Sequence, residues 1–228
     1  PRPLHEGEIE VGPTCEFTQL RDAIRAAAPG ATIRLGPGRY SGPVMIAKDL
    51  TLIGAGPGRT QVAGIRIGGN AAVELRDLAL SNFDSYGLDV EGEARVSLVN
   101  CVLSNNGWVG LYVHQGAWVT LRGCTISGNR GGGLEVGNRA QVVLQDCTIS
   151  GNKWIGLSVK DSAQVNLENS TITENEGSGL HVYVPELWGF VRVNLEKCTI
   201  ESNAWAGVFM EGEVQATVIN CLIQKNTD

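Results

Sequence analysis

The chain has 228 residues, of which 43% are hydrophobic, and 18 Lys and Arg against 24 Asp and Glu give it a net charge of −6. An acidic chain without a cluster of Lys or Arg does not fit a nucleic-acid partner, because phosphates demand concentrated positive charge. The sequence contains no run of 18 apolar residues, so it predicts no membrane span. The first residues include neither Met nor an apolar signal segment, so we expect a processed or excised chain.

The N-terminal part is expected to consist of an extended segment, residues 1–15, followed by a helix over about 17–28. Apolar residues recur there at helical spacing, and Pro29-Gly30 ends the pattern. These apolar residues are Phe17, Leu20, Ala23, Ile24 and Ala27. We expect the helix to cover the first coil of a single domain, residues 16–228, because an open strand edge otherwise recruits other chains.

From about residue 42 to the end of the chain, the sequence repeats with a period of 23. A Gly-aliphatic-x-aliphatic motif begins at Gly64, Gly87, Gly110, Gly133, Gly156, Gly179 and Gly207, with five intervals of 23 and one of 28. A Leu column, a Cys column, an Ile column and an Asn column keep the same register. Such alignment over six units indicates a repeat architecture.

Within each unit apolar and polar residues alternate, as in "AQVVLQDCTIS", which is typical of strands and leaves no room for a long helix. Parallel strands joined by such short connections stack only if the chain coils, so that each strand lies on its own copy about 4.8 Å away. The sequence therefore predicts an all-β fold: a single-stranded parallel β-helix of about 8 coils, capped by the N-terminal helix.

The motif "CTISGN…GGLEV" resembles the right-handed parallel β-helix repeat of pectate-lyase-like proteins. The segment from Phe17 to Val62 resembles the N-terminal part of the same superfamily, which includes pectin methylesterases and periplasmic β-helix accessory proteins. The resemblance covers about residues 14–228. It implies a right-handed β-helix and a secreted or periplasmic location, but it implies no single activity because the superfamily hosts lyases, hydrolases, esterases, epimerases and binding modules.

Two of the columns are interpreted as architecture. Five Cys residues, Cys101, Cys124, Cys147, Cys198 and Cys221, share an inward register with Leu78 and Ser170, and their spacing resembles no zinc signature. We expect them to be buried, unpaired thiols, which are also compatible with the cytosol, and we expect no metal and no cofactor. The Asn column, Asn106, Asn129, Asn152, Asn175, Asn203 and Asn226, predicts a ladder of stacked amides at a left-handed turn.

The x position of the Gly-aliphatic-x-aliphatic motif points outward and holds residues that a scaffold does not require. In order, this column contains Arg66, Asp89, Tyr112, Glu135, Ser158, His181 and Phe209. Asp89 and Glu135 lie two coils apart, roughly 9.6 Å between backbones, with Tyr112 between them, so their carboxyl groups could approach the spacing used by inverting glycosidases. Arg66 is the only basic residue that the sequence places on this face.

Near the same column, "YGLDVE" at residues 86–91 resembles the Tyr-Gly-Phe-Asp-Pro-His motif of mannuronan epimerases. Tyr86, Gly87 and Asp89 match the first, second and fourth positions. Leu88 and Val90 depart from the motif, and Glu91 stands where the motif has His. The resemblance is therefore weak evidence for an epimerase activity.

Three Trp residues, Trp108, Trp154 and Trp205, share one register in every second coil, and Gly131 and Gly177 occupy it in between. The pattern predicts either a flat aromatic row with a repeat near 9.6 Å, suited to stacking on a polysaccharide, or Trp rings that seal backbone over Gly.

The interval of 28 contains an insertion, at about residues 183–190, that is rich in apolar and aromatic residues. An exposed aromatic loop on a regular scaffold is a candidate contact site. His181, Tyr183 and Trp188 are the candidate ligand-binding residues here, with Phe209 on the neighbouring coil.

Two functions follow from these features. The first, which we favour, is a scaffold whose outward column, Trp row and aromatic loop bind a polysaccharide or a protein. The alternative is a polysaccharide-active lyase, C5-epimerase or glycoside hydrolase that uses Asp89, Tyr112 and Glu135. The chain ends within a coil, at Asn226-Thr227-Asp228. We therefore expect a partner or further residues to cover the last coil, or the coil to mediate end-to-end self-association.

Overall fold

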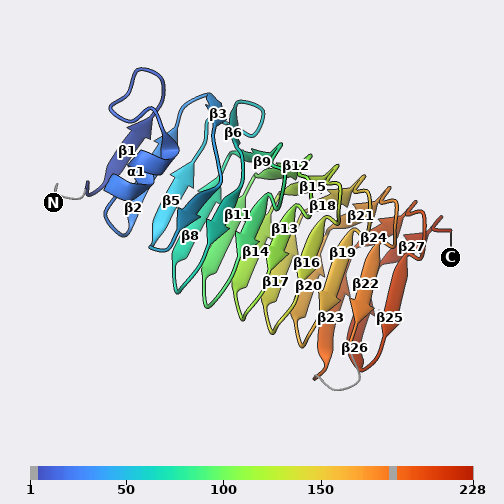
Figure 1. The fold of residues 1–228 in the computed structure, drawn as a ribbon. Helices are drawn as coiled ribbons and strands as arrows, with labels where there is room; N and C mark the ends of the chain where they lie inside the picture. The colour runs from blue at the N-terminus through green and yellow to red at the C-terminus, as the bar shows by residue number, and fades with distance from the viewer. Residues whose placement is uncertain (1–4, 185–188, 228) are drawn as a thin grey trace.

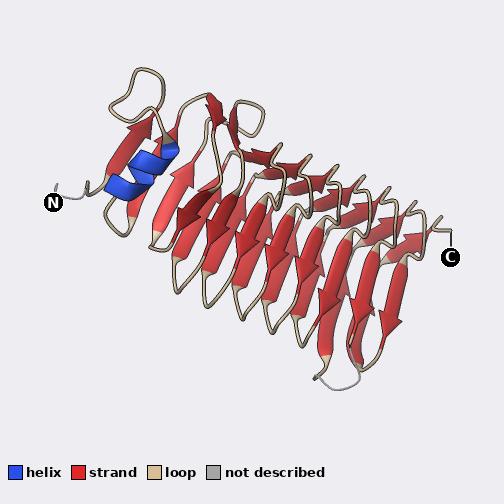
Figure 2. Cartoon of the chain, viewed as in Figure 1, coloured by secondary structure: helices blue, strands red, loops and turns tan. Residues whose placement is uncertain are grey.

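The computed structural model describes residues 5–184 and 189–227 of the chain. Over these residues the chain coils about nine times into a parallel β-helix with one short helix near the N-terminus, as Figure 1 and Figure 2 show. The predicted fold is confirmed. There is one coil more than expected, because residues 8–35 already contribute two strands ahead of the regular repeat.

Within the described residues, the strands form three parallel sheets that run the length of the solenoid. The 10-stranded sheet consists of β1 (Glu8–Val11), β2 (Ala31–Leu35), β5 (Leu50–Ile53), β8 (Ala72–Arg76), β11 (Arg95–Val99), β14 (Trp118–Arg122), β17 (Gln141–Gln145), β20 (Gln164–Glu168), β23 (Val191–Glu196) and β26 (Val214–Ile219).

The other two sheets contain shorter strands. The 9-stranded sheet consists of β3 (Gly38–Tyr40), β6 (Thr60–Val62), β9 (Ala79–Ser81), β12 (Val102–Ser104), β15 (Thr125–Ser127), β18 (Thr148–Ser150), β21 (Thr171–Thr173), β24 (Thr199–Glu201) and β27 (Leu222–Gln224). The 8-stranded sheet consists of β4 (Val44–Ile46), β7 (Ile65–Ile67), β10 (Leu88–Val90), β13 (Leu111–Val113), β16 (Leu134–Val136), β19 (Leu157–Lys160), β22 (Leu180–Tyr183) and β25 (Val208–Glu211).

The helix α1 (Leu20–Ala26) packs against β1, β2 and β4 at the N-terminal end, where it buries Leu20, Ala23 and Ile24. It is shorter than the predicted span of 17–28 because both flanking residues are extended. Phe17 forms a β-bridge with Val11, and Ala27 forms one with His5. The segment expected to be merely extended also contributes β1, which pairs in register with β2.

The interior is built from columns of identical apolar side chains. Leu98, Leu121 and Leu144 stack in register through β11, β14 and β17 and are essentially inaccessible to solvent. Burying one such side chain contributes roughly 1.5–3 kcal/mol. Repetition of the column in each coil therefore explains why one coil dictates the register of the next.

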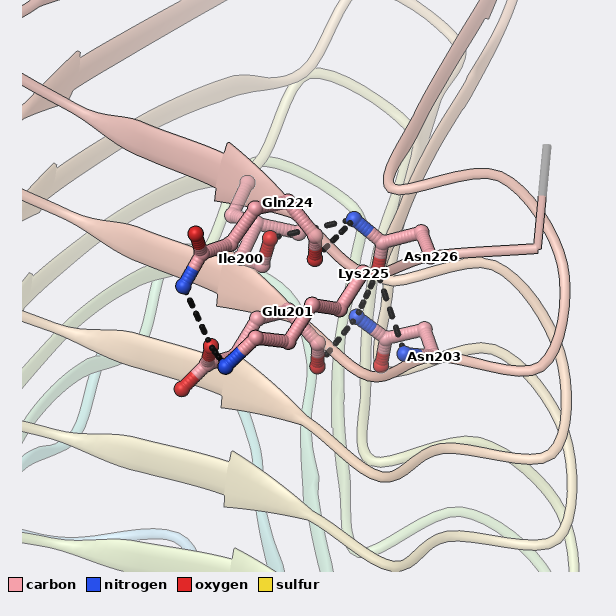
Figure 3. Close-up of polar contacts among 6 residues, drawn as sticks. All are labelled: Ile200, Glu201, Asn203, Gln224, Lys225 and Asn226. Carbon is pink, nitrogen blue, oxygen red and sulfur yellow. Dashed lines mark hydrogen bonds and ion pairs between the residues drawn. The ribbon is translucent and has the colours of Figure 1, made fainter.

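The predicted Asn ladder is present, and Figure 3 shows its C-terminal end. Nδ2 of Asn203 donates to Oδ1 of Asn226 at 3.0 Å, and Oδ1 of Asn226 also accepts from the backbone N–H of Asn203 at 3.0 Å. The same pair of bonds links Asn129 to Asn152, both fully buried. The left-handed residue at this turn is the one before each Asn, such as Asn105 or Gly151, and not the ladder Asn itself.

The Asn ladder also explains the Gly column. A Cβ added at Gly110 would lie 2.6 Å from Nδ2 of Asn129 and 2.7 Å from a methyl group of Ile126 in the next coil. The start of the Gly-aliphatic-x-aliphatic strand therefore has no room for a side chain. The most frequent motif in the sequence is a consequence of packing.

The Cys column has no disulfide, as predicted, and Cys101, Cys124, Cys147 and Cys198 are buried as expected. The fifth member, Cys221, is partly exposed, which differs from the prediction, and so is Cys15 outside the column. A hydrogen bond with Cys101, followed by burial, raises the pKa of Cys124 to about 12. A hydrogen bond with Cys124, followed by burial, raises the pKa of Cys147.

The last coil differs from the others in exposure. Val218 and Ile223 belong to inward columns that are buried in preceding coils, yet they are 47% and 45% exposed. The strands β25, β26 and β27 each have one paired neighbour in the described chain. Within the described residues, no element covers these apolar side chains and strand edges.

Candidate functional site

The outer face of the 8-stranded sheet carries the predicted outward column. Cα partners follow one another in the order Met45, Arg66, Asp89, Tyr112, Glu135, Ser158, His181 and Phe209 across β4, β7, β10, β13, β16, β19, β22 and β25. The aliphatic residues on either side of each column member point into the core. The alternation of the strand thus places a chemically varied column on this face.

Asp89 is the most enclosed member of the column, with 7% of its side chain exposed. Its Oδ2 accepts a hydrogen bond from Nε of Arg66 at 2.8 Å and lies 2.8 Å from Nη2 of the same guanidinium in an ion pair. Its Oδ1 lies 3.0 Å from Nε2 of His114, whose side chain is 11% exposed. Both oxygens of Asp89 are therefore engaged, and the carboxylate lies beneath this face and does not project from it.

His114 follows β13 and occupies the register of Glu91 one coil earlier. The imidazole of His114 therefore contacts Asp89 of the "YGLDV" segment from the next coil. Glu91 lies close as well, with a carboxylate oxygen 3.9 Å from Nε2 of His114. An aspartate that hydrogen-bonds one ring nitrogen fixes the orientation of an imidazole.

Three rings are stacked beside this carboxylate. Tyr112 packs on His114 with a centroid distance of 4.2 Å and an interplanar angle of 10°, and Tyr86 packs on Tyr112 at 5.2 Å. Burial, followed by the Glu135 carboxylate, raises the pKa of both Tyr86 and Tyr112. Both phenols therefore stay protonated near neutral pH and can donate hydrogen bonds to a ligand.

Glu135 faces a different cation from Asp89. Its Oε1 lies 2.6 Å from Nζ of Lys160, which extends over Gly137, where no side chain intervenes. Burial opposes the charge of Lys160, but the hydrogen bond and the charge of Glu135 outweigh it and raise the pKa of Lys160. Asp89 and Glu135 are consequently two separately neutralised carboxylates on either side of Tyr112.

The prediction that Arg66 is the only basic residue on this face was wrong. His114 and Lys160 lie two residues beyond the outward position of their strands, outside the column on which that prediction depended. Their only signal in the sequence is a polar residue directly after the second aliphatic of the motif.

Two pockets open on this face. One, of about 390 Å³, is lined by Trp108, Trp154, Arg130, Lys153, Glu135 and Lys160, among others. The other, of about 270 Å³, lies nearer the N-terminal end and includes Met45, Arg66, Phe83, Tyr86 and Asp89. Tyr86, which lines the second pocket, stacks on Tyr112, so the ring stack begins at that pocket, and the polar cluster and both pockets lie on the same outer face.

The Trp residues do not form the flat, evenly spaced row that their register suggested. Trp154 and Trp205 meet edge to face, with ring centroids 5.0 Å apart and an interplanar angle of 69°, although they belong to coils two apart. A Cβ at Gly177 would lie 2.9 Å from the backbone of Trp154, so this Gly makes room for backbone and not for a ring. Trp108, Trp154 and Trp205 remain about half exposed.

The predicted ligand-binding residues near the insertion lie farther along the sheet. His181 packs edge to face on Phe209 at 5.0 Å, and burial lowers the pKa of His181. Tyr183 ends β22 and is 45% exposed. Trp188 lies outside the described residues. Because Tyr183 ends β22 whereas Trp108, Trp154 and Trp205 precede strands of this sheet, Tyr183 and these Trp residues lie at opposite ends of the strands.

The structure does not add a metal centre to these features. Over residues 5–184 and 189–227, His, Cys, Asp and Glu side chains form no group of three or more that could hold a metal ion. None of the helical segments in this range has the length and apolar character needed to cross a membrane.

The coiled fold and the polar, aromatic outer face define a β-helix protein with a surface site. Residues 58–184, more than half of the chain, match the family described as the right handed beta helix region, so the chain belongs to this family and its coil is right-handed. Among proteins of curated function, none matches the sequence.

Solved structures of the same fold include the pectate lyase Pel9A, with a TM-score of 0.76 and 14% identity over 94% of this chain and 69% of that chain. The pectin methylesterase from Aspergillus niger matches with a TM-score of 0.71 and 13% identity over 100% of this chain and 90% of that one. The periplasmic alginate epimerase AlgG matches with a TM-score of 0.71 and 10% identity over 95% of this chain, which spans 55% of AlgG. At these identities the similarity shows the fold.

Proposed function

We propose that the outer face of the 8-stranded sheet binds an acidic polysaccharide. The observation that carries this proposal is the pocket of about 390 Å³ between the exposed rings of Trp108 and Trp154. Its lining contains the three cations Arg130, Lys153 and Lys160 and one carboxylate, Glu135, in a protein whose net charge is −6. Aromatic faces stack on the apolar side of sugar rings, and guanidinium and ammonium groups bind carboxylates.

The ion pairs of the pocket leave positive charge for a ligand. Lys160 is neutralised by Glu135, and Lys153 pairs with Glu176 at an exposed position where such pairs are weak. Arg130 has no ion pair with any residue in the described part of the chain. A ligand carboxylate therefore gains more at this pocket than a neutral sugar does.

The names of the related structures support the same ligand class. They refer to pectate, pectin and alginate, which are acidic polysaccharides. The proposal implies that the protein works in a compartment that contains such a polymer. The alginate epimerase AlgG, for example, is periplasmic.

A glycan array of acidic and neutral polysaccharides tests the proposal when it is probed with the wild-type protein and with two variants. Wild-type protein is expected to retain pectate or alginate, and the double variant Trp154→Ala, Lys153→Gln is expected to lose this retention. Trp118→Ala, on the 10-stranded sheet, is the matched control and keeps it. Equal retention of acidic polymers by wild type and double variant would contradict the proposal.

A specific observation favours a second candidate function, catalysis on the same polymer. The Asp89 carboxylate orients His114, and Tyr112 stacks on that imidazole and holds its phenolic proton. An oriented imidazole and a protonated phenol can serve as base and acid in proton transfer at a sugar carbon. A lyase or an epimerase would use such a pair, with Asp89 as a positioning residue.

Incubation of the protein with oligogalacturonate and oligomannuronate separates catalysis from binding. Unsaturated products or altered uronate composition that are lost in His114→Gln and Tyr112→Phe, with binding retained, would establish the enzyme. Unchanged oligomers in the presence of demonstrated binding would leave the binding scaffold as the function.

We further propose that the last coil makes an end-to-end contact with a second copy of the chain, because Val218 and Ile223 expose inward-column side chains beside open strand edges. Sedimentation velocity is expected to show a dimer that Ile223→Lys dissociates. A monomer at concentrations up to about 1 mM would rule this contact out.

A further inference from the structure

The outer face of the 10-stranded sheet carries a second hollow, separate from the candidate site. Its volume is about 500 Å³, and it is lined by residues of β5, β8, β11 and β14 together with Gly30 and Asp49. The candidate site uses the 8-stranded sheet, so this hollow lies on a different face of the solenoid.

Trp118 forms one wall of this hollow, at a position where the repeat requires no aromatic residue. Trp118 begins β14, its side chain is 47% exposed, and it belongs to none of the columns that form the core. Its Cα partner on β11 is Arg95, whose own partner on β8 is Ala72. The short Ala72 side chain leaves space beside Arg95, and Arg95 and Trp118 both line the hollow.

The central column of the hollow carries hydroxyl groups. Thr51, Ser97 and Thr120 point outward from β5, β11 and β14, with Glu74 between Thr51 and Ser97. From Thr51 to Thr120 the column covers three strand spacings, about 14 Å. Hydroxyl groups both donate and accept hydrogen bonds, which suits the alcohols of a sugar.

The charges of the lining do not favour an acidic ligand. Asp49 and Glu74 oppose the single cation Arg95, and Glu74 is held by Arg76 at 2.6 Å. Asp49 accepts the backbone N–H of Ala72 at 2.8 Å. The guanidinium of Arg95 has no hydrogen bond or ion pair with any other described residue, so it can donate to ligand hydroxyls.

From the Trp118 wall, the hydroxyl column and the balanced charges, we infer that this hollow is a second carbohydrate site that takes a neutral pyranose chain. The C–H face of one sugar ring stacks on Trp118, and Arg95, Ser97 and Thr120 bond its hydroxyl groups. The inference is independent of the proposed function, because the two sites use different sheets and select ligands of different charge.

Nuclear magnetic resonance tests this site directly, because the chain has five Trp residues and each gives one indole N–H signal. Single Trp→Ala variants assign the signals. We expect cellohexaose or β-1,4-mannohexaose to shift the Trp118 signal, and oligogalacturonate hexamer to shift the signals of Trp108 and Trp154 instead. The two ligands thus report on the two proposals separately.

Calorimetric titration with the neutral hexasaccharides measures the contribution of each group. Trp118→Ala is expected to weaken binding by at least about tenfold, and Thr120→Val, which keeps the size of the side chain, by about threefold. Trp108→Ala is the matched control, with unchanged affinity for neutral sugar. The inference is overturned if neither hexasaccharide shifts the Trp118 signal at 20-fold molar excess over about 1 mM protein, or if the acidic hexamer shifts it more strongly.

Discussion

Asp89 and His114 belong to neighbouring coils and form a side-chain hydrogen bond, with Oδ1 of Asp89 3.0 Å from Nε2 of His114. Because Asp89 also accepts from Arg66, this one carboxylate links three successive coils of the 8-stranded sheet. The contact supports the stack of Tyr112 on His114 and thereby the shape of the outer face of this sheet.

Replacing Asp89 by Ala is expected to lower the free energy of unfolding by about 2 kcal/mol, because it removes a buried acceptor from two donors. Urea denaturation followed by circular dichroism measures the change. Asp22→Ala is the control, since Asp22 forms only an exposed ion pair with Arg25 at 3.8 Å and should cost less than about 0.5 kcal/mol. Equal effects of the two substitutions would show that the Asp89 contacts contribute no net stability.

The Asn ladder gives a second stability prediction. Asn152→Ala removes the acceptor for the backbone N–H and for one side-chain N–H of Asn129, and it removes a donor to the carbonyl of Ile126, all in the interior. We expect a loss of about 3 kcal/mol, measured by the same denaturation. Asn166→Ala is the matched control, because Asn166 accepts from Asn194 on the exposed outer face. A cost for Asn152→Ala no larger than for Asn166→Ala is the contrary result.

We expect the reactivity of each thiol to depend on whether it is buried. In native protein we expect Ellman's reagent to modify two of the six Cys residues, Cys15 and Cys221, and all six after denaturation in guanidinium. The buried thiols are inaccessible, and the raised pKa values of Cys124 and Cys147 further suppress the reactive thiolate. Rapid native modification of four or more thiols would mean that the coils open readily.

His181 makes stability depend on pH. Burial lowers its pKa in the folded state, so the unfolded chain binds a proton first as the pH falls through the ordinary value of about 6.5. The His181 contribution is therefore complete above that value and is lost as the pH falls toward the lowered pKa. Between pH 7 and pH 5 we expect His181→Asn to lose less stability than wild type. Identical losses over this range would contradict this assignment.

The fold follows from the sequence to a large extent because the repeat encodes it in columns. An aliphatic side chain every 23 residues can be buried only if the coils stack in register, and the Gly and Asn columns then require one another, as Gly110 and Asn129 show. The ends of the helix were less predictable, because Phe17 and Ala27 satisfy the helical spacing but pair with residues 11 and 5.

The candidate site was predictable only where it coincides with a column. Arg66, Asp89, Tyr112 and Glu135 were found in this way, whereas His114 and Lys160 reach back one coil from positions that the repeat leaves undefined. The direction of such long side chains depends on local partners and on gaps such as that at Gly137. Side-chain rotation likewise brings Trp154 onto Trp205, which register alone does not foresee.

The most direct test of the proposed function is calorimetric titration with uronate hexamers, namely galacturonate, mannuronate and guluronate. The methyl-esterified galacturonate hexamer is the neutral control, and all titrations use the Trp118→Ala background so that the hollow on the 10-stranded sheet does not contribute. We predict that at least one acidic hexamer binds, that its affinity falls as NaCl is raised from 50 to 500 mM because exposed charges are screened, and that the double variant Trp108→Ala, Trp154→Ala abolishes the binding. Absence of binding by all three acidic hexamers, or undiminished binding by the double variant, would contradict an acidic-polysaccharide site on the outer face of the 8-stranded sheet.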